Sequence, residues 1–321
     1  QQCIDNWTST ANLLKDEASS ECDSEYAVLI ASAPDNHARR VSIRNSWKKL
    51  GTNKITENEN TWIQRPEKMI RFFFVVGTGG SDKLQLETEN SINHDMLLLD
   101  DFVDSYKALT SKMLLSLKWI SNNMKGLKYL VKCDDDSFLR IDLIVHTLEA
   151  YAPTMDAPEI SEYISSQKHA HYKGLYWGYF NGRARVYKSG KWEERNWFLC
   201  DRYLPYALGG AYVISRNIVD FIARNADDLS QYNSEDVSMG VWTASLDGIN
   251  RVHDIRFDTS ATSRGCSDDM LVTHKVSPSA MTEIYTTLQN SHGKKLCKDV
   301  GVNNYYVYNW TAMTSMCCKV T

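Results

Sequence analysis

The sequence predicts an α/β fold in which a mostly parallel β-sheet is covered by helices on both faces. Its 321 residues, 43% of them hydrophobic, are enough to bury the core of one large domain or of two closely joined lobes. Through the first 150 residues, short apolar runs alternate with amphipathic stretches of helical period. This alternation is typical of parallel sheets, which bind ligands at the carboxyl ends of their strands.

The elements of this fold follow one another along the chain. Continuous apolar runs predict strands at residues 26–31, 70–76, 96–99 and 127–133. Helical periodicity and capping residues predict helices at residues 38–50, 81–93 and 106–124. Residues 52–66 are polar and lack a period, which indicates a surface loop. The polar first 24 residues indicate a stem, so a single folded domain is expected over residues 25–321.

The chain becomes less regular beyond residue 160. Residues 169–210 are rich in aromatic side chains, glycine and arginine, and shorter helices are expected again near Asn217 and Asp236. Sugar rings stack on flat aromatic rings with polar edges, so this composition favours a substrate-binding lobe. The alternative is an irregular core packed with Trp and Tyr.

Charge and cysteine content indicate the class of partner and the compartment. A net charge of −4 and a pI near 6.1 argue against a nucleic-acid partner, because binding phosphates requires a surplus of cations. The eight cysteines are widely spaced, which favours disulfides over a zinc site, with reduced cytosolic thiols as the alternative. Neighbouring cysteines seldom bond to each other, so Cys317 and Cys318 are expected to tie the tail to two different parts of the chain.

Two sequons also favour an oxidising lumen. Asn6 and Asn309 each begin an Asn-Trp-Thr tripeptide, the acceptor of N-glycosylation in secreted proteins. No stretch approaches the roughly 20 apolar residues of a membrane span. We therefore expect a secreted protein, or a lumenal domain whose membrane anchor lies outside these residues.

Three consecutive carboxylates follow the predicted strand at residues 127–133. Asp134, Asp135 and Asp136 would repel one another unless a cation lies among them. Their hard oxygen atoms suit Mg²⁺ or Mn²⁺, and such an ion can neutralise a leaving diphosphate. A solvated acidic turn is the alternative, but the position at the carboxyl end of a strand favours a metal site.

A basic helix begins close to the carboxyl end of the first predicted strand. It carries Arg39, Arg40, Arg44 and Lys48, with Arg40 and Arg44 four residues apart on one face. A helix N-terminus and guanidinium groups together can hold diphosphate oxygens. The alternative is a solvated basic face.

Two later segments add acid–base and metal-binding candidates. Glu235 and Asp236 follow Ser234 at the start of a predicted helix, where one acid can match the helix dipole. The second acid can serve as a general base for an acceptor hydroxyl, although simple dipole matching by both is the alternative. His274 ends a short apolar run, where a neutral imidazole can complete a metal site, whereas most single histidines are structural or exposed.

Taken together, these segments resemble glycosyltransferase family 31, the inverting β1,3-galactosyl- and β1,3-N-acetylglucosaminyltransferases. The resemblance covers almost the whole body of the chain. It is carried by the patterns RRxxIRxTW, DFxDSYxNLTxKT, KxDDDxF, YxxGGGYVxS and EDV, which match residues 37–47, 101–113, 132–138, 206–215 and 235–237. The chain departs from these patterns at Ser46, Ala108, Met113 and Ala211.

The resemblance implies a GT-A-type fold with a Rossmann-like mixed sheet flanked by helices. It divides the domain near residue 150 into a nucleotide-sugar half and an acceptor half, with Asp236 as the base and with Asp136 and His274 as ligands of Mn²⁺. Residues expected to bind the donor or its UDP are Ala31, Arg40, Arg44, Asp104, Tyr106, Lys112, Lys132, Asp134 and Asp135. Residues expected to contact the acceptor or the donor sugar are Trp177, Tyr179, Tyr206, Gly209, Gly210 and Glu235.

Four further segments resemble the family members that build the proteoglycan linkage region, namely residues 176–185, 200–206, 264–267 and 317–318. They imply UDP-galactose as donor, galactosyl-β1,4-xylosyl-serine on proteoglycan core proteins as acceptor, and a type II protein of the Golgi lumen. The alternatives are a family member with another donor or acceptor, a metal-dependent hydrolase and a catalytically silent carbohydrate-binding relative. Intact Asp136 and Asp236 argue against the silent relative.

Overall fold

The centre of the molecule is a seven-stranded mixed β-sheet. The structure, a computed structural model, describes residues 24–51, 69–156, 174–302 and 305–320. In spatial order the strands of the sheet are β3 (Met96–Leu99), β2 (Ile70–Gly77), β1 (Tyr26–Ala31), β4 (Tyr129–Asp134), β7 (Tyr206–Ser215), β6 (Gly174–Asn181) and β8 (Ile249–His253). The first four are parallel, β7 is antiparallel to both of its neighbours, and β8 is parallel to β6. The predicted α/β class with a mixed sheet is confirmed.

The four parallel strands are the apolar runs that predicted them. Val28, Leu29 and Ile30 of β1 are fully buried, as is typical of parallel strands covered on both faces. Full burial of each such side chain stabilises the fold by about 1.5–3 kcal/mol. Ala31 pairs in register with Asp134 of β4, so the carboxyl ends of β1 and β4 meet at one edge of the sheet.

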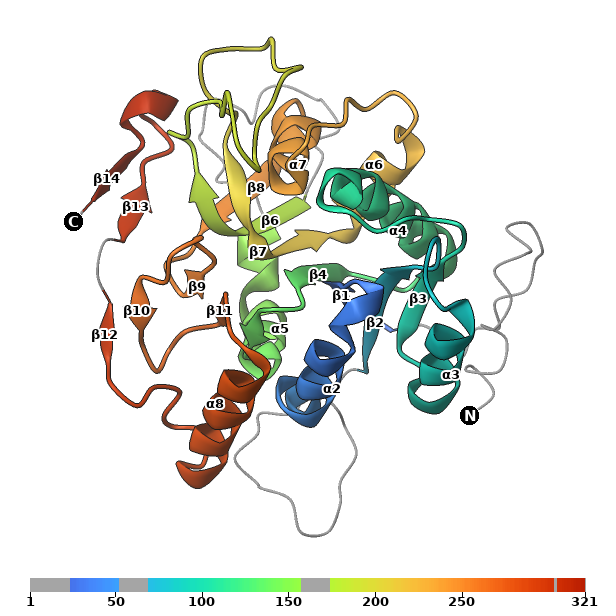
Figure 1. Ribbon diagram of the computed structural model, residues 1–321. Helices are drawn as coiled ribbons and strands as arrows, with labels where there is room; N and C mark the ends of the chain where they lie inside the picture. The colour runs from blue at the N-terminus through green and yellow to red at the C-terminus, as the bar shows by residue number, and fades with distance from the viewer. Residues whose placement is uncertain (1–23, 52–68, 157–173, 303–304, 321) are drawn as a thin grey trace.

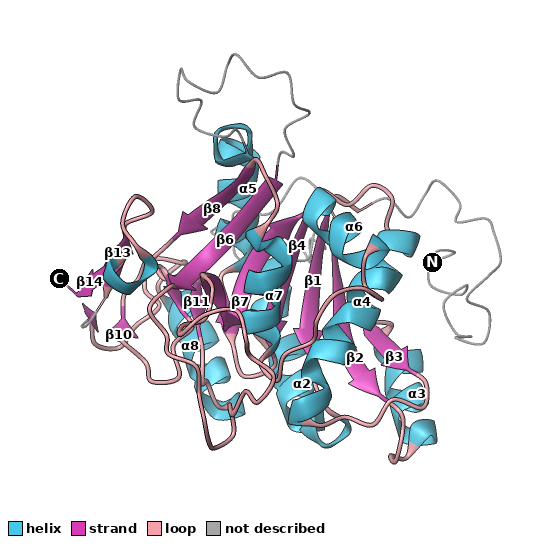
Figure 2. Cartoon of the chain, turned by 90° about the horizontal axis from the view of Figure 1, so that it is seen from above, coloured by secondary structure: helices cyan, strands magenta, loops and turns pink. Residues whose placement is uncertain are grey.

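Helices cover both faces of the sheet (Figures 1 and 2). Helices α4 (Leu109–Asn123), α6 (Arg216–Arg224) and α7 (Glu235–Ala244) lie on one face. The other face is covered by α2 (His37–Asn45), α5 (Ile141–Asp156) and α8 (Pro278–Asn290), with α3 (Lys83–Asn93) beside α2. Short 3₁₀ turns lie at Pro34–Asn36, Trp47–Gly51, Tyr106–Ala108 and Thr314–Met316.

Short strands form three smaller sheets beside the central one. In the described residues these strands are β5 (Phe138–Leu139), β9 (Phe257–Asp258), β10 (Gly265–Cys266), β11 (Val272–Thr273), β12 (Gly301–Val302), β13 (Tyr306–Tyr308) and β14 (Cys318–Val320). Strand β11 lies between β5 and β9. This pairing brings the residues that follow β11 next to those that precede β5.

Two regions differ from the sequence-based expectation. The aromatic segment expected to be irregular contains β6 and β7, whose nearly continuous burial on both faces removes the alternation that would have revealed them. The predicted helix at residues 38–50 is interrupted at Ser46, which has a non-helical ψ of −111°. The predicted loop at residues 52–66 and almost all of the predicted stem lie outside the described residues.

The cysteines form two disulfides within the described part of the chain. Cys266 bonds to Cys297, which ties β10 to the segment after α8. Cys317 bonds to Cys318, so the expectation that these neighbours pair with different parts of the chain is wrong. Cys133 is free and buried, whereas Cys200 is free and exposed.

None of the helices in the described part of the chain combines the length and the apolar character that crossing a bilayer requires.

The bond between Cys266 and Cys297 is expected to stabilise the fold. Because it joins residues 31 positions apart, Cys297→Ser should lower the free energy of unfolding by about 2–4 kcal/mol. Denaturant titration measures this change. Cys200→Ser is the matched control, because it alters an exposed free thiol and should change the free energy by less than about 0.5 kcal/mol. Equal destabilisation by the two variants would contradict this role.

Candidate active site

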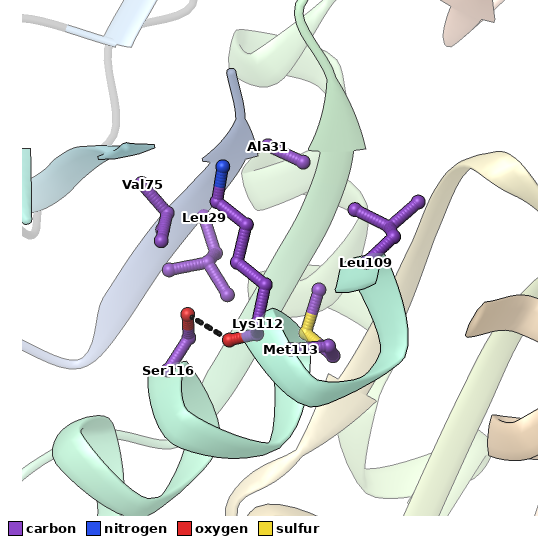
Figure 3. A pocket seen from close by; sticks show the side chains of 7 residues that line it. All are labelled: Leu29, Ala31, Val75, Leu109, Lys112, Met113 and Ser116. Carbon is purple, nitrogen blue, oxygen red and sulfur yellow. Dashed lines mark hydrogen bonds between the residues drawn. The ribbon is translucent and has the colours of Figure 1, made fainter. Parts of the chain in front are cut away.

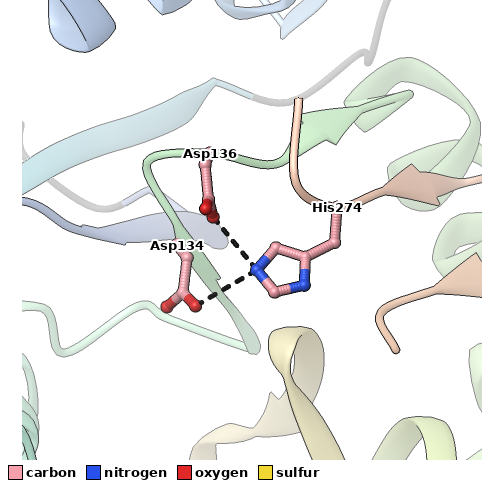
Figure 4. A group of neighbouring side chains, drawn as sticks. All are labelled: Asp134, Asp136 and His274. Carbon is pink, nitrogen blue, oxygen red and sulfur yellow. Dashed lines mark ion pairs between the residues drawn. The ribbon is translucent and has the colours of Figure 1, made fainter. Parts of the chain in front are cut away.

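Two carboxylates and a histidine converge at the carboxyl edge of the sheet. His274 Nε2 lies 3.0 Å from Asp136 Oδ1 and 3.5 Å from Asp134 Oδ2 (Figure 4). One ligand atom from each residue falls within 4.8 Å of the others. Asp134 ends β4, and His274 follows β11 with its backbone N–H donating to Asp258 O. Asp136 and His274, which are 138 positions apart in the sequence, come together because β11 pairs with β5.

The chemistry of this cluster fits a divalent cation. Both ring nitrogens of His274 are buried and make no hydrogen bond within the described residues, although Nε2 faces two carboxylates. Burial lowers the pKa of His274, but Asp134 and Asp136 raise it to about 9. The two carboxylates that favour a proton on His274 also favour a metal ion there, so a proton and a metal ion compete for the position beside Nε2. Two carboxylates and one imidazole are a ligand set that Mn²⁺ and similar ions accept.

Asp135 points away from this cluster, toward the loop that follows β1. It accepts hydrogen bonds from Ser32 Oγ and Asn36 Nδ2, both at 2.8 Å, and from Arg39 Nη1 at 3.0 Å. Arg39 Nη1 also lies 3.4 Å from Asp136 Oδ2. Asp135 therefore does not belong to the Asp134, Asp136 and His274 cluster. It holds Arg39, which in turn contacts Asp136.

Two cations at the rim of the cluster were not among the predicted site residues. They are Arg39, whose side chain is 37% exposed, and Lys275, whose Nζ lies 3.1 Å from Asp136 Oδ2. Both are accessible to an anionic ligand that approaches the cluster. Arg39 belongs to the basic helix, so the positive charge of that helix was a sequence signal for a contact with an anion. Lys275 directly follows His274, but only the fold shows that it faces Asp136.

Lys132 connects the metal cluster to the second acidic segment. Its Nζ donates to Asp134 Oδ1 at 2.9 Å and to Gly209 O at 2.6 Å, and lies 3.0 Å from Glu235 Oε2. The side chain is 1% exposed, so the expected contact between Lys132 and phosphate is replaced by an internal one. Glu235 also accepts a hydrogen bond from Tyr212 Oη at 2.5 Å. Glu235 is therefore a buried supporting residue rather than a sugar contact.

Asp236 has the properties of a general base. Its Oδ2 accepts from Gly209 N and its Oδ1 from Val237 N, both at 2.9 Å, which fixes the carboxylate at the start of α7. Burial, together with the neighbouring charge of Glu235, raises the pKa of Asp236 to about 6. A carboxylate with this pKa is ionised at neutral pH and is a stronger base than an ordinary aspartate.

The glycine pair of β7 separates the base from the metal cluster. A Cβ on Gly209 would lie 3.3 Å from Asp236 Oδ2, and a Cβ on Gly210 would lie 2.8 Å from the His274 ring. Gly210 O also accepts from Ser137 Oγ. A side chain at position 210 would collide with the His274 ring, and one at position 209 would press on the Asp236 carboxylate.

Lys112 and Asp104 hold the loops at the ends of β1 and β2. The Lys112 stem lies between α4 and β1, and its Nζ points toward the Ala31 end of β1 (Figure 3). The Nζ donates to Ser32 O and to Asp104 Oδ1. Asp104 also accepts from Gly77 N at 2.7 Å. Lys112 is buried, so it shapes the edge of the site instead of reaching a phosphate.

Tyr106 and Tyr206 remain beside the carboxylates. Burial raises the pKa of Tyr106 to about 12, with Asp236 and Asp134 among the charges that act on it. Tyr206 is buried, and Asp236 adds to the burial effect that raises its pKa. Both rings therefore lie near Asp236, and the binding of the donor by Tyr106 and of the acceptor or donor sugar by Tyr206 remain predictions.

Arg40 and Arg44 do not face the site. Arg40 donates to both carboxylate oxygens of Glu89 and to the carbonyls of residues 33 and 34. Arg44 pairs with Glu89 at 2.7 Å and with Asp95 at 2.7 Å. The prediction that Arg40 and Arg44 contact phosphate is therefore wrong. Both guanidinium groups form ion pairs with Glu89 of α3, and Arg44 also pairs with Asp95 in the turn after α3.

Trp177 and Tyr179 also require a correction. Both are almost fully buried in β6, so neither offers a face to a sugar. Trp177 Nε1 donates to Asp254 Oδ2 at 3.0 Å, and the Tyr179 ring packs against Tyr306 and Arg264. Of the predicted glycosylation sites, Asn309 is exposed, whereas Asn6 lies outside the described residues.

Substitution of Gly210 tests the proximity of β7 to His274. Gly210→Ala should displace the His274 ring and weaken Mn²⁺ binding by about 10- to 100-fold, as loss of ligand orientation does elsewhere. Titration calorimetry with Mn²⁺ measures the affinity. Gly301→Ala is the control, because its Cβ would meet no atom within 4 Å. Unchanged Mn²⁺ affinity in Gly210→Ala would contradict the assignment of His274.

Comparison with known proteins places this site in a family. A sequence profile described as galactosyltransferase matches residues 38–254. Beta-1,3-galactosyltransferase 6 of Mus musculus is 40% identical over 297 residues, which cover 91% of this chain and 82% of the relative. UDP-GalNAc:beta-1,3-N-acetylgalactosaminyltransferase 2 of Xenopus laevis is 27% identical, covering 75% of this chain and 44% of that protein.

Among solved structures, the galactosyltransferase LgtC in complex with donor and acceptor sugar analogues aligns with a TM-score of 0.39 and 12% identity, over 86% of this chain and 97% of that chain.

The profile covers more than half of the sequence and the mouse relative aligns with nearly all of it. The chain therefore belongs to the galactosyltransferase family.

Proposed function

We propose that this chain is an inverting β1,3-galactosyltransferase that transfers galactose from UDP-galactose to the 3-hydroxyl of the galactose in galactosyl-β1,4-xylosyl-serine. Family membership implies a nucleotide-sugar donor and a glycan acceptor. The name of the mouse relative supports the linkage, and the residues shared with linkage-region enzymes support the acceptor. The proposed mechanism rests on one observation: Asp236, a carboxylate with a raised pKa, lies near the Asp-Asp-His cluster.

In the proposed reaction Asp236 removes the proton of the acceptor 3-hydroxyl while that oxygen attacks the anomeric carbon of galactose. The new carbon–oxygen bond forms as the bond from this carbon to the β-phosphate breaks, and UDP leaves with the electron pair. One displacement converts the α-linked donor into a β-linked product, so a single base suffices and no glycosyl-enzyme forms. Gly209 N, which donates to Asp236, keeps the carboxylate oriented during the transfer.

We assign the diphosphate to the side of the site that carries the metal cluster. Asp136 and His274, with Asp134, would hold Mn²⁺, which when bound supplies positive charge that neutralises the departing diphosphate. Arg39 and Lys275 lie at the rim of this cluster and can donate to phosphate oxygens. They take the role first expected of Arg40 and Arg44.

The proposed setting is the lumen of the Golgi. The disulfide between Cys266 and Cys297 fits an oxidising compartment. Asn309 is exposed in a turn where its Oδ1 accepts from Thr311 N and Thr311 Oγ1, so the sequon is accessible to glycosylation. The acceptor would be a sugar on a proteoglycan core protein.

Acceptor-dependent release of UDP tests this function. Purified protein with UDP-galactose, Mn²⁺ and a galactosyl-β1,4-xyloside should release UDP, whereas EDTA or UDP-N-acetylglucosamine should abolish release. Asp236→Asn keeps the hydrogen bond from Gly209 but removes the base, so kcat should fall by about 10²- to 10⁴-fold. Asp227→Asn, which alters an exposed carboxylate on the surface, is the matched control and should retain activity.

Each alternative gives a different result in the same assay. UDP release without acceptor would indicate a hydrolase, and preference for the other donor would move the chain elsewhere in the family. Absence of turnover with intact Mn²⁺ binding would favour a silent carbohydrate-binding relative. Full activity of Asp236→Asn would contradict the named base.

The pH dependence follows from the environment of Asp236. Its charged and titratable neighbours are Glu235, Lys132, Tyr106 and Tyr206. Because only the ionised carboxylate accepts a proton, kcat/KM at saturating Mn²⁺ should decline below pH 6, by about tenfold per unit. Glu235→Gln removes the charge that contributes to the raised pKa, so the decline should begin at lower pH. A profile that stays flat from pH 7 to 4 would contradict this assignment.

A further inference from the structure

The loop between β6 and β7 carries an excess of positive charge next to the base. This segment, residues 182–205, contains six Lys or Arg and three Asp or Glu, within a chain whose net charge is −4. Most of its cationic side chains are exposed. The site that it borders contains Asp134, Glu235 and Asp236, whose negative charge the buried cation Lys132 offsets only in part, so exposed cations nearby would favour the approach of an acidic ligand.

A buried carboxylate fixes this loop to the segment that leads into α7. Glu194 is 6% exposed, and its Oε2 accepts from Asn233 N at 2.6 Å. Asn233 Nδ2 in turn donates to Lys191 O and Glu193 O, each at 3.1 Å. Asn233 is three positions before Asp236, so residues 191–194 are held at a defined place beside the base. The backbone that carries Lys191 is therefore preorganised.

Lys188 and Lys191 are exposed cations that lie close in sequence to the segment held by Asn233. Lys191 Nζ lies 4.4 Å from the centroid of Tyr106, whose ring borders Asp236. Both lysines are exposed, and neither forms an ion pair with a carboxylate of the described residues. Arg195 on the same loop differs, because it is paired with Glu193 at 3.1 Å.

Two aromatic side chains extend the same exposed surface. Tyr187 and Trp192, which flank the two lysines in the sequence, lie 5.5 Å apart between ring centroids and are 45% and 39% exposed. Beneath them Trp197, Tyr203 and Tyr232 form a buried cluster that supports the loop. Exposed rings beside unpaired ammonium groups form a surface that suits an extended chain carrying carboxylates.

We infer that the 182–205 loop binds acidic residues of the peptide that bears the acceptor sugar, with Lys188 and Lys191 as the specificity-determining cations. This inference rests on the proposed function. In that function the acceptor serine is only two sugars away from the reacting hydroxyl, so the peptide must pass near the residues around Asp236. The loop adds attraction for acidic flanks without taking part in the chemical step.

Matched glycopeptides test this inference. One acceptor carries galactosyl-β1,4-xylosyl-serine flanked by Glu, a second has Gln at the same positions, and a third is a neutral galactosyl-xyloside. The wild-type protein should show a kcat/KM about fivefold higher for the Glu peptide than for the Gln peptide at low salt, because exposed ion pairs are individually weak. The preference should shrink toward one at about 0.5 M salt.

Charge variants identify the residues responsible. The double variant Lys188→Gln and Lys191→Gln should lose the preference, whereas Lys188→Arg with Lys191→Arg should keep it, which separates charge from a folding defect. Lys298→Gln, which alters an exposed lysine paired with Glu283 on another surface, is the control and should keep the preference. Equal kcat/KM for the two peptides, or an unchanged preference in the Gln double variant, would overturn the inference. If none of the three acceptors received galactose, the result would instead contradict the proposed function.

Discussion

The buried ammonium group of Lys132 holds the two parts of the active site together. It contacts Asp134 of the metal cluster, Gly209 of the central glycine pair and Glu235 beside the base. Burial alone would lower the pKa of Lys132, but Asp134 and Glu235 raise it above its ordinary value, so the group stays charged. Removing one partner from such a buried network costs about 3–5 kcal/mol, because the remaining charges are left uncompensated. One charged side chain thus links the Asp-Asp-His cluster to the residue that precedes Asp236.

The basic residues near the site differ in burial and in their partners. Arg40, Arg44 and Lys112 are enclosed and paired, and they hold the loops after β1 and β2 in place. Arg39 and Lys275 are exposed at the rim and can meet an incoming anion. Within α2, the face that carries Arg40 and Arg44 is therefore paired with carboxylates of the fold, whereas Arg39 lies beside Asp135 and Asp136.

Much of the fold and part of the site could be predicted from the sequence. The parallel half of the sheet was predictable because β1, β2 and β4 are continuous apolar runs, and Asp134 to Asp136 were found because they end such a run. The predicted ligand contacts of Arg40 and Trp177 were wrong. Residue type does not reveal that the Arg40 guanidinium is bonded to Glu89 or that Trp177 Nε1 donates to Asp254. The contact of Lys275 with Asp136 depends on tertiary placement that local pattern does not encode. The disulfide of Cys317 with Cys318 is a local bond, and it was missed because neighbouring cysteines seldom bond to each other.

The proposed mechanism is a single displacement at the anomeric carbon, with Asp236 as the only base and no covalent intermediate on the protein. Proton NMR of the product formed from UDP-galactose, recorded as it accumulates, measures the configuration and position of the new bond directly. We expect a β-linked galactose on the 3-hydroxyl of the acceptor as the first detectable product. An α-linked product would require retention of configuration and would contradict the mechanism.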